Sequence, residues 1–250
     1  MDLGLRGKRC LVTGSTAGIG LETAKLLVAE GARVATSGRS AAPAMGEALH
    51  IRADLAEPAA PAGLVDRVVE GLGGLEILVN NVGFAVHARF EDVADAEWES
   101  MWQLNVMSYV RAIRAALPAL RASGGAVVNV SSTSGKRPSA GMPHYSVTKA
   151  AVLSLSRLVA DLYAGDGIRC NAVTPGPTAT EAWLGKGGLA DQQGGERSEV
   201  LAKVGAGRPL GRLADAEEIA AVIVFLASER ASYVTGAAWS ADGGTVPIII

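Results

Sequence analysis

Short apolar runs alternate with longer amphipathic stretches along the whole chain. Brief apolar runs bounded by glycine or polar residues are typical of strands that are buried on both faces. Such runs predict seven strands, at residues 10–12, 32–36, 48–51, 76–79, 126–130, 168–173 and 237–240. Apolar residues that recur every three or four positions predict helices at residues 19–30, 61–71, 94–121, 145–164 and 215–227.

This alternation of strands and helices predicts the topology. A strand, a helix and a second strand form a right-handed crossover, and repeated crossovers build a parallel sheet with helices on both faces. No internal repeat or linker divides the chain, and α/β folds of this length commonly form a single unit. We therefore predict the α/β class, with one doubly wound Rossmann-type domain over residues 1–250 and a parallel seven-stranded sheet.

Two segments interrupt the alternation. Residues 38–49 leave room for a loop or a stub of helix, but not for a full crossover helix. Residues 179–208 are rich in glycine and carry scattered apolar residues such as Trp183, Leu184 and Leu189. A connection of this length is either disordered or a mobile lid over a site. Because the apolar residues would be costly to leave in water, we expect a substrate lid at about residues 179–208.

Composition and charge exclude several classes of partner. Hydrophobic residues make up 49% of the chain and aromatic residues only 4%, which is typical of parallel strands under Ala-rich helices. A net charge of -2 provides no basic field for nucleic acid or an anionic membrane. We find neither a membrane span nor a secretion signal, and we expect Cys10 and Cys170 to be buried free thiols. We therefore expect a cytoplasmic protein without nucleic-acid or membrane partners.

A glycine-rich turn joins the first predicted strand to the first predicted helix, with the sequence Thr13-Gly14-Ser15-Thr16-Ala17-Gly18-Ile19-Gly20. Glycine tolerates positive φ and lets the backbone approach a pyrophosphate, whose charge then meets the helix N-terminus. In a chain with 31 glycines the spacing alone is a weak signal. The strand before it and the helix after it are the context of a dinucleotide site, whereas the alternative is a tight turn without a ligand.

The end of the second predicted strand bears on which dinucleotide binds. An acidic residue about 20 positions after the turn would bind the ribose 2′-hydroxyl of NAD, and this chain has none there. Arg39 and the neighbouring hydroxyls instead suit the 2′-phosphate of NADP, which we favour over NAD. The alternative is that Arg39 is a solvated loop residue. Asp54, after the third strand, would contact the adenine amino group or cap a helix beginning near Pro58.

Tyr145 and Lys149 form the candidate catalytic pair, because a spacing of four residues places them on one face of a helix. A phenol with an ordinary pKa near 10 is a poor acid or base at neutral pH, and a nearby cation lowers that pKa. Ser131, Ser132 and Asn81 follow predicted strands at the edge where open α/β sheets bind ligands. An exposed helix turn and polar loops without function are the alternatives.

Taken together, these segments resemble a known family. The whole chain is similar to the compact branch of the short-chain dehydrogenases/reductases, whose members are of about this length. The matching segments follow the family's order: residues 13–20, 80–83, Asn105, Ser132, Tyr145, Lys149, 175–178, 209–212, 217–220, 233–236 and 242–244. Each motif is weak alone, but their joint order and spacing make a strong signal.

The resemblance implies four catalytic residues and no metal. Tyr145 would be the general acid in reduction and the base in oxidation. Lys149 would bind the nicotinamide ribose and lower the pKa of the tyrosine, and Ser132 would hydrogen-bond the substrate oxygen. Asn105, inside the long predicted helix, would hold a water that relays protons toward Lys149.

The resemblance also implies a set of cofactor-binding residues. These are Gly14, Ser15, Thr16, Gly18, Ile19, Gly20, Arg39, Asp54, Leu55, Asn81, Gly83, Tyr145, Lys149, Pro175, Gly176 and Thr178. Val173 would pack behind the nicotinamide. Val82 replaces the family's usual alanine, which we expect only to shift the packing. The segment between Arg39 and Asp54 is short for the family, so we expect no helix there and a more open adenine end.

Three functions are compatible with these residues. The leading one is hydride transfer between NADP(H) and a small-molecule ketone or secondary alcohol. The runner-up is reduction of a 3-oxoacyl group on an acidic carrier protein (or of a polyketide), for which Lys136 and Arg137 are the candidate contacts. A non-catalytic dinucleotide sensor belongs to another class, and relatives of that kind usually lose the tyrosine or the lysine.

Further expectations concern assembly and the surroundings of the substrate. The predicted helices 94–121 and 145–164 carry apolar residues on more than one face, which require a partner. The resembling family usually builds tetramers from these helices, and the apolar residues 246–250 would join them, so we expect a homotetramer. His87 and His144 flank the expected site, and we expect both to be exposed loop residues.

Overall fold

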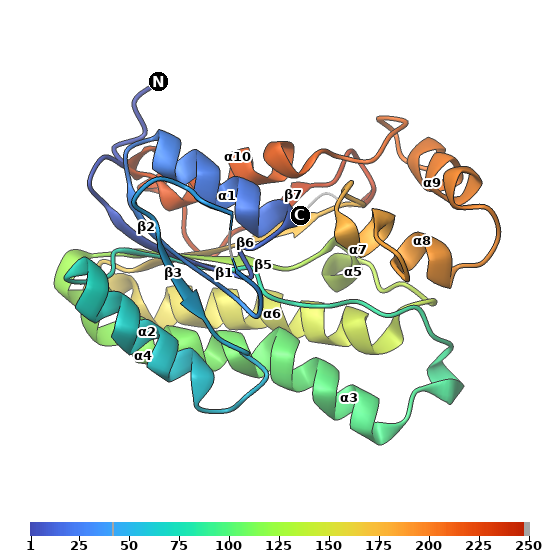
Figure 1. Ribbon diagram of the computed structural model, residues 1–250, viewed down its shortest axis with the longest axis horizontal. Coiled ribbons are helices and arrows are strands. Elements are labelled where there is room, and N and C mark those ends of the chain that lie inside the picture. The colour runs from blue at the N-terminus through green and yellow to red at the C-terminus, as the bar shows by residue number, and fades with distance from the viewer. Residues whose placement is uncertain (42, 248–250) are drawn as a thin grey trace.

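The structure, a computed structural model that describes residues 1–41 and 43–247, contains one parallel seven-stranded sheet (Figure 1). The strands are β1 (Arg9–Thr13), β2 (Arg33–Gly38), β3 (Leu49–Arg52), β4 (Ile77–Asn80), β5 (Ala126–Val130), β6 (Arg169–Pro175) and β7 (Ala238–Ala241). Their order across the sheet is β3-β2-β1-β4-β5-β6-β7. The direction of winding reverses between β1 and β4, where doubly wound sheets bind ligands. The predicted fold is confirmed.

Helices cover both faces of the sheet. They are α1 (Gly18–Ala29), α2 (Ala60–Leu72), α3 (Asp95–Trp102), α4 (Ser108–Ser123), α5 (Thr133–Lys136), α6 (Pro143–Tyr163), α7 (Glu181–Leu184), α8 (Leu189–Gln192), α9 (Arg197–Ala206) and α10 (Ala216–Ala227). Short 3₁₀ turns lie at Phe90–Asp92, Ala164–Asp166 and Glu229–Ala231. Helices α1 and α10 cover one face, and α2, α4 and α6 cover the other (Figure 1). None of the described helices is long and apolar enough to cross a membrane.

The alternation of side chains along the strands creates two apolar layers. In β1, Leu11 packs into the layer beneath α2 and α4, whereas Cys10 and Val12 pack into the layer beneath α1 and α10. Each fully buried aliphatic side chain contributes about 1.5–3 kcal/mol to folding. Cys10 and Cys170 are buried free thiols, as predicted.

One predicted helix is interrupted. Residues 94–121 form α3, a π-helical turn at Gln103–Met107 and then α4. A π turn adds one residue to a helical turn, and the apolar spacing on either side of it stays helical, so hydrophobic periodicity does not reveal it. Between β2 and β3, residues 39–41 and 43–48 form no helix, as the short segment predicts.

The glycine-rich segment 179–208 contains local structure. It forms α7, α8 and α9, which lie together beyond one end of the sheet (orange in Figure 1). Leu189 and Ala190 of α8 are buried, whereas Trp183 is only partly covered and Leu184 is 39% exposed. Its apolar residues are therefore partly sheltered, and the expected role of the segment as a lid stays a prediction.

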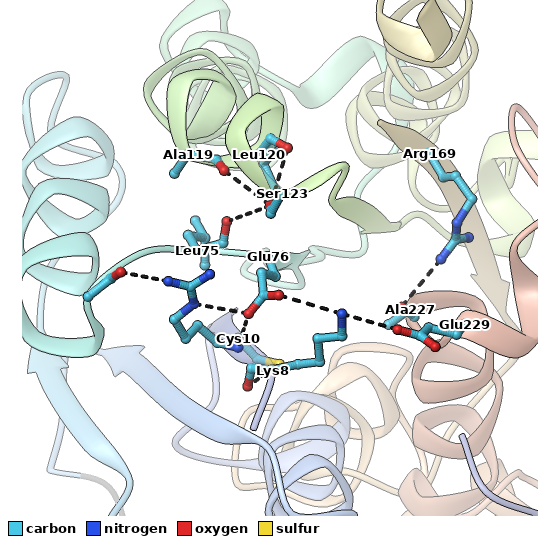
Figure 2. A network of polar contacts seen from close by, with 12 residues as sticks. Lys8, Cys10, Leu75, Glu76, Ala119, Leu120, Ser123, Arg169, Ala227 and Glu229 are labelled. Carbon is cyan, nitrogen blue, oxygen red and sulfur yellow. Dashed lines mark hydrogen bonds and ion pairs between the residues drawn. The ribbon is translucent and has the colours of Figure 1, made fainter. Parts of the chain in front are cut away.

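A network of charged side chains joins the amino ends of β1 and β4 (Figure 2). The Glu76 carboxylate accepts hydrogen bonds from the Arg9 backbone N–H at 3.0 Å and the Arg9 Nε at 2.9 Å. Lys8 bridges Glu76, at 3.5 Å, and Glu229, at 3.1 Å. Burial opposes ionisation of Glu76, but the bonds from Arg9 and the charge of Lys8 bring its pKa below 4.5. The network holds the sheet at the end opposite the carboxyl ends.

Candidate active site

The glycine turn after β1 leaves the amino end of α1 open. Gly14 and Gly18 have φ angles of 61° and 55°, which residues with a Cβ rarely adopt. A Cβ on Gly20 would collide with the Gly14 carbonyl and with the Asn81 amide. The unpaired N–H groups of the first helical turn favour an anion, and bare glycines let a pyrophosphate come close.

Asn81 connects this turn to the end of β4 through hydrogen bonds. Its Nδ2 donates hydrogen bonds to the carbonyls of Thr13 at 3.1 Å and Gly14 at 2.9 Å. The Thr13 hydroxyl accepts hydrogen bonds from the N–H groups of Asn81 and Val82, at 3.0 and 3.3 Å. Asn81 therefore shapes the glycine turn in addition to any contact with a ribose. Thr13 is a positioning residue that our sequence analysis missed.

Ser132 occupies the N-cap of α5, directly after β5. Its Oγ accepts a hydrogen bond from Ser134 N at 3.1 Å. The neighbouring Ser131 hydroxyl donates to the Lys149 carbonyl at 2.7 Å. A Cβ on Gly135 would lie 2.7 Å from the same carbonyl, so α5 approaches α6 closely. The serine-rich loop of the sequence is thus a capped helical turn held against the helix that carries Tyr145 and Lys149.

Lys149 is buried, with 3% of its surface exposed. Its Nζ donates a hydrogen bond to the Val130 carbonyl at 2.9 Å and lies 5.7 Å from the centroid of the Tyr145 ring. Removal from water lowers the pKa of Lys149 from 10.5 to about 7. Both protonation states are therefore accessible near neutral pH, which is the property that a proton relay needs.

Tyr145 borders the cavity described below. Burial raises the pKa of Tyr145 above 10.0, and the Ser132 hydroxyl offsets only part of this shift. The expected net lowering of the tyrosine pKa by Lys149 is therefore not met in the protein alone. The positive charge of an oxidised nicotinamide would lower the tyrosine pKa when that group is bound.

Asn105 lies in the π turn and is fully buried. Its Oδ1 accepts a hydrogen bond from Phe84 N at 3.1 Å, and its Nδ2 donates to Phe84 O at 3.0 Å. A Cβ on Gly83 would lie 3.1 Å from Asn105 Oδ1 and 3.4 Å from Lys149 Nζ. The amide of Asn105 thus holds the loop after β4 next to Lys149. Its expected part in a water relay stays a prediction.

A cavity of about 870 Å³ opens at the carboxyl ends of β1, β4, β5 and β6. Many of the predicted residues line it: Gly14, Gly18, Ile19, Asn81, Gly83, Ser132, Tyr145, Lys149, Pro175, Gly176 and Thr178. The segment 179–208 supplies a further wall through residues such as Trp183 and Leu189. The fold therefore gathers three of the four expected catalytic residues and the glycine turn around one space, whereas Asn105 is buried outside the lining.

Three predicted cofactor residues pack inside the fold and do not line the cavity, so their contact with a cofactor stays a prediction. The Ser15 hydroxyl donates to Val12 O at 2.6 Å and accepts from Ser37 N at 2.9 Å, so it ties β1 to β2. Gly20 packs beneath the turn, where its lack of a side chain allows the close contact with Asn81. Leu55 is buried in the apolar layer under α2.

Three more predicted cofactor residues lie near the carboxyl ends of β1, β2 and β3, outside the lining of the cavity. Thr16 packs against Gly38, and Arg39 is exposed beside it. Asp54 is exposed, and its Oδ1 accepts a hydrogen bond from Ala56 N at 3.1 Å. Asp54 therefore caps its own turn, because α2 begins only at Ala60. Their contact with the adenine end of a dinucleotide stays a prediction.

Tyr109 is a second residue that our sequence analysis missed. It is fully buried, and its hydroxyl lies 3.0 Å from Val82 O and 3.2 Å from Val130 O. Lys149 Nζ lies 5.6 Å from the centroid of its ring. Its spacing of four residues from Asn105 places both on one helix face, and this was the available signal.

The two histidines near the site differ from each other. His87 is exposed at the cavity, as predicted. The prediction of an exposed loop was wrong for His144, which is 2% exposed. Pro143 begins α6, so His144 lies in the first helical turn, where its ring packs against Trp98 with 5.8 Å between centroids. Burial lowers the pKa of His144 below 6.5.

Sequence comparisons agree with this geometry. A family model described as enoyl-(acyl carrier protein) reductase matches residues 14–246. The uncharacterized oxidoreductase YvrD of Bacillus subtilis is 38% identical over 98% of this chain and 99% of its own. Cis-4-hydroxycyclohexanecarboxylate dehydrogenase of Sinomonas cyclohexanicum is 37% identical over 94% of each chain.

A solved structure is similar over the whole chain. The L-sorbose reductase of Gluconobacter frateurii, in complex with NADPH and L-sorbose, is 34% identical over 100% of both chains, with a TM-score of 0.92. The family match, the relatives and the solved structure agree on the fold and on the oxidoreductase class. The chain belongs to the short-chain dehydrogenase/reductase family and is an oxidoreductase.

Proposed function

We propose that the protein transfers a hydride between NADP(H) and a ketone or secondary alcohol, with Tyr145 as general acid and base. The observation that carries this proposal is that Ser132, Tyr145 and Lys149 share one cavity with the glycine turn. Two relatives act on, or bind, compounds with a carbonyl or an alcohol: cis-4-hydroxycyclohexanecarboxylate and L-sorbose.

The protein's own groups account for the proton. In reduction, a bound dinucleotide would supply a hydride to the carbonyl carbon. The Tyr145 hydroxyl gives its proton to the carbonyl oxygen, on which negative charge develops, while Ser132 donates a hydrogen bond to the same oxygen. Lys149, whose pKa is about 7, then returns a proton toward the tyrosine. In oxidation, Tyr145 takes the proton from the alcohol.

The preference for NADP rests on Arg39. It is exposed and directly follows Gly38, the last residue of β2, which packs against Thr16 of the glycine turn. The adenine ribose of a dinucleotide on the glycine turn would end near this strand end. A guanidinium pairs with a phosphate through two hydrogen bonds, and no carboxylate at this strand end competes for the 2′-hydroxyl. We expect Arg39→Gln to reduce kcat/KM for NADPH about tenfold or more and to leave that for NADH nearly unchanged.

The test of the function is turnover by the purified protein. We expect it to oxidise NADPH in the presence of at least one ketone from a panel of ketones, β-keto thioesters, steroids and quinones. Tyr145→Phe should reduce kcat at least about 100-fold, because it removes the proton donor. Binding of NADPH, measured by fluorescence titration, should persist in the variant. A Tyr145→Phe enzyme with full activity would overturn the proposed mechanism.

A carrier-protein substrate is less well supported by the surface near the cavity. Lys136 donates hydrogen bonds to the Ala238 carbonyl at 2.6 Å and to the Ser240 hydroxyl at 3.0 Å, so it is held against β7. Arg137 alone remains exposed there for an acidic partner. We therefore favour a small-molecule substrate. Activity with β-keto thioesters and none with simple ketones would favour the carrier instead.

We also propose that residues 179–208 act as a lid. Their start packs on the glycine turn, because a Cβ on Gly18 would lie 3.2 Å from the Thr180 side chain. In α8, Gln192 Oε1 accepts a hydrogen bond from His87 N at 2.8 Å, which joins the segment to the loop after β4. Protease digestion within residues 179–208 should slow when NADPH and substrate are present. Unchanged digestion would contradict a lid.

We also propose that the protein forms a homotetramer and is located in the cytoplasm. Exposed apolar side chains on α6 support self-association, namely Val147, Leu158 and Leu162. The free thiols Cys10 and Cys170 are compatible with a reducing compartment.

A further inference from the structure

The cavity carries more positive charge than the proposed catalysis uses. Its charged lining consists of Arg137, Lys149, Glu181 and Arg208. Lys149 is used in the proposed mechanism, where it returns a proton toward Tyr145. The Glu181 carboxylate folds back toward Gly185 on its own side of the segment, where an added Cβ would collide with it. The two arginines are therefore left for a ligand.

Among residues 1–41 and 43–247, the Glu181 carboxylate forms no ion pair with Arg137 or Arg208. The Asp191 carboxylate, and to a smaller extent Glu181, raise the pKa of Arg197 above its ordinary value. Arg197 pairs with Asp191 at 2.6 Å and donates to Leu184 O at 3.0 Å. The Arg197–Asp191 pair and the bond to Leu184 O therefore tie α7, α8 and α9 together.

Arg208 follows the end of α9 and has an unusual surrounding for a charged side chain. Its Nε is buried and has no hydrogen-bond partner among residues 1–41 and 43–247. Within the same described residues, no carboxylate forms an ion pair with it. A buried N–H of a charged group is costly when it lacks an acceptor. Arg137 differs because it is exposed, so water satisfies it.

The chemistry of the missing partner follows from the geometry of a guanidinium. The Nε itself has almost no exposed surface, but the Arg208 side chain lines the cavity. A guanidinium presents pairs of parallel N–H groups, which match the two oxygens of a carboxylate. A neutral ketone or sugar offers single, uncharged oxygens. We propose that the substrate is an oxo acid or hydroxy acid whose carboxylate binds Arg208 while its carbonyl or alcohol oxygen meets Ser132 and Tyr145. This inference rests on the proposed function of the same cavity.

An anion could also reach Arg208 from the dinucleotide, whose phosphates would lie in the same cavity near the glycine turn. The two sources make different predictions for Arg208→Gln. A contact with the substrate changes the discrimination between charged and neutral substrates. A contact with the cofactor raises the dissociation constant of NADPH for every substrate.

The kinetic test uses pairs of oxo acids and their uncharged primary amides, with the carboxyl group one to four carbons from the ketone. We expect the wild-type enzyme to favour the acid of the best pair by at least about tenfold in kcat/KM. Arg208→Gln should lose this preference while it keeps activity on the amide, and Arg208→Lys should restore only part of it. Arg137→Gln removes the same charge from the same cavity and should change the preference less than about threefold, because an exposed charge acts weakly.

A binding test decides the matter independently of turnover. Saturated carboxylic acids of the same lengths, added with NADPH, should raise the melting temperature of the wild type and leave that of Arg208→Gln unchanged. Equal shifts in both proteins, or weaker NADPH binding by Arg208→Gln, would overturn the proposal. If amides and acids are all inert but the acids still bind through Arg208, the proposed ketone reduction fails and the carboxylate site stands. If the enzyme turns over acids and amides without preference, the proposed ketone reduction stands and the proposed carboxylate site at Arg208 is wrong.

Discussion

At the scale of single residues, burial acts on the two central side chains in opposite directions. It raises the pKa of Tyr145 above 10.0 and lowers that of Lys149 to about 7. Both shifts disfavour the charged form, because neither group has a carboxylate or a cation as hydrogen-bond partner. The Lys149 Nζ bonds only to the neutral Val130 carbonyl within the described part of the chain. The site therefore holds an ammonium group whose proton is easily given up.

A buried lysine of this kind costs stability, and the cost depends on pH. The unfolded chain takes up the lysine proton below pH 10.5, whereas the folded chain does so only below about pH 7. The free energy of unfolding therefore rises with pH between about pH 7 and pH 10.5. Below about pH 7 the contribution of Lys149 to it is constant. Lys149→Met should be more thermostable than the wild type at pH 7, and the difference in melting temperature should shrink toward pH 10. Its kcat should fall at least about 100-fold.

The control for this prediction is Lys25→Met, which removes a lysine from the surface of α1, where it pairs with Glu22 at 2.8 Å. Melting curves recorded at pH 7, 8.5 and 10 should show no comparable decrease in the difference in melting temperature between Lys25→Met and the wild type. A wild-type protein that exceeds Lys149→Met in stability at pH 7 would mean that Lys149 stays fully protonated in the fold.

At the scale of elements, the strands were the most predictable part. Buried parallel strands appear as continuous apolar runs, so β5 and β6 could be placed within a residue or two from residues 126–130 and 168–173 alone. The candidate pair Tyr145 and Lys149 was predicted from its spacing along the chain, and Ser132 and Asn105 from the family resemblance. Contacts between distant segments were not predictable, such as Thr13 with Asn81 or the burial of His144 against Trp98. Such contacts depend on how helices and loops pack against one another. The hydrophobic periodicity of the sequence predicts the elements but not their packing.

The π turn at Gln103–Met107 is the clearest case of an element hidden from sequence, and it supports a prediction. It places the Asn105 amide between α6 and the loop after β4, where it satisfies both the N–H and the carbonyl of Phe84. Asn105→Ala should lower the free energy of unfolding by about 1–3 kcal/mol, because both groups lose their partners. It should also lower kcat, since the loop borders Lys149.

The matched control is Gln103→Ala in the same π turn, whose side chain accepts a hydrogen bond from Arg111 at 2.8 Å. Urea unfolding and initial rates of both variants would separate the two contributions. Equal effects of Asn105→Ala and Gln103→Ala on kcat would show that the turn, and not the Asn105 amide, positions the loop.

At the scale of the whole molecule, the stabilising charge network and the cavity lie at opposite ends of the sheet. Glu76 and Lys8 join the amino ends of the strands (Figure 2), and Arg9 also bonds to Glu76. The cavity lies at the carboxyl ends. Glu76→Gln should lower the free energy of unfolding at pH 7 by about 1–3 kcal/mol, because its partners stay partly buried. The Glu76 pKa is lowered in the fold, so its contribution is present above pH 4.5 and is lost as the pH falls below that value. The difference between variant and wild type should therefore shrink at pH 4, while kcat at pH 7 stays unchanged.

The exposed side of α6 supports the last prediction, which concerns assembly. Val147, Leu158 and Leu162 are 49%, 54% and 60% exposed, and their spacings of eleven and four residues place them on one face of the helix. Such an apolar stripe is costly in water, so we expect light scattering to give about four times the chain mass of 25.5 kDa. Leu158→Glu combined with Leu162→Glu should yield smaller species, because a carboxylate cannot be buried unpaired at a helix contact. Phe90→Glu, which changes a side chain that is 70% exposed outside α4 and α6, should leave the mass unchanged. A wild-type protein that scatters as a monomer would contradict the proposed tetramer, and the cavity that one chain forms by itself would remain.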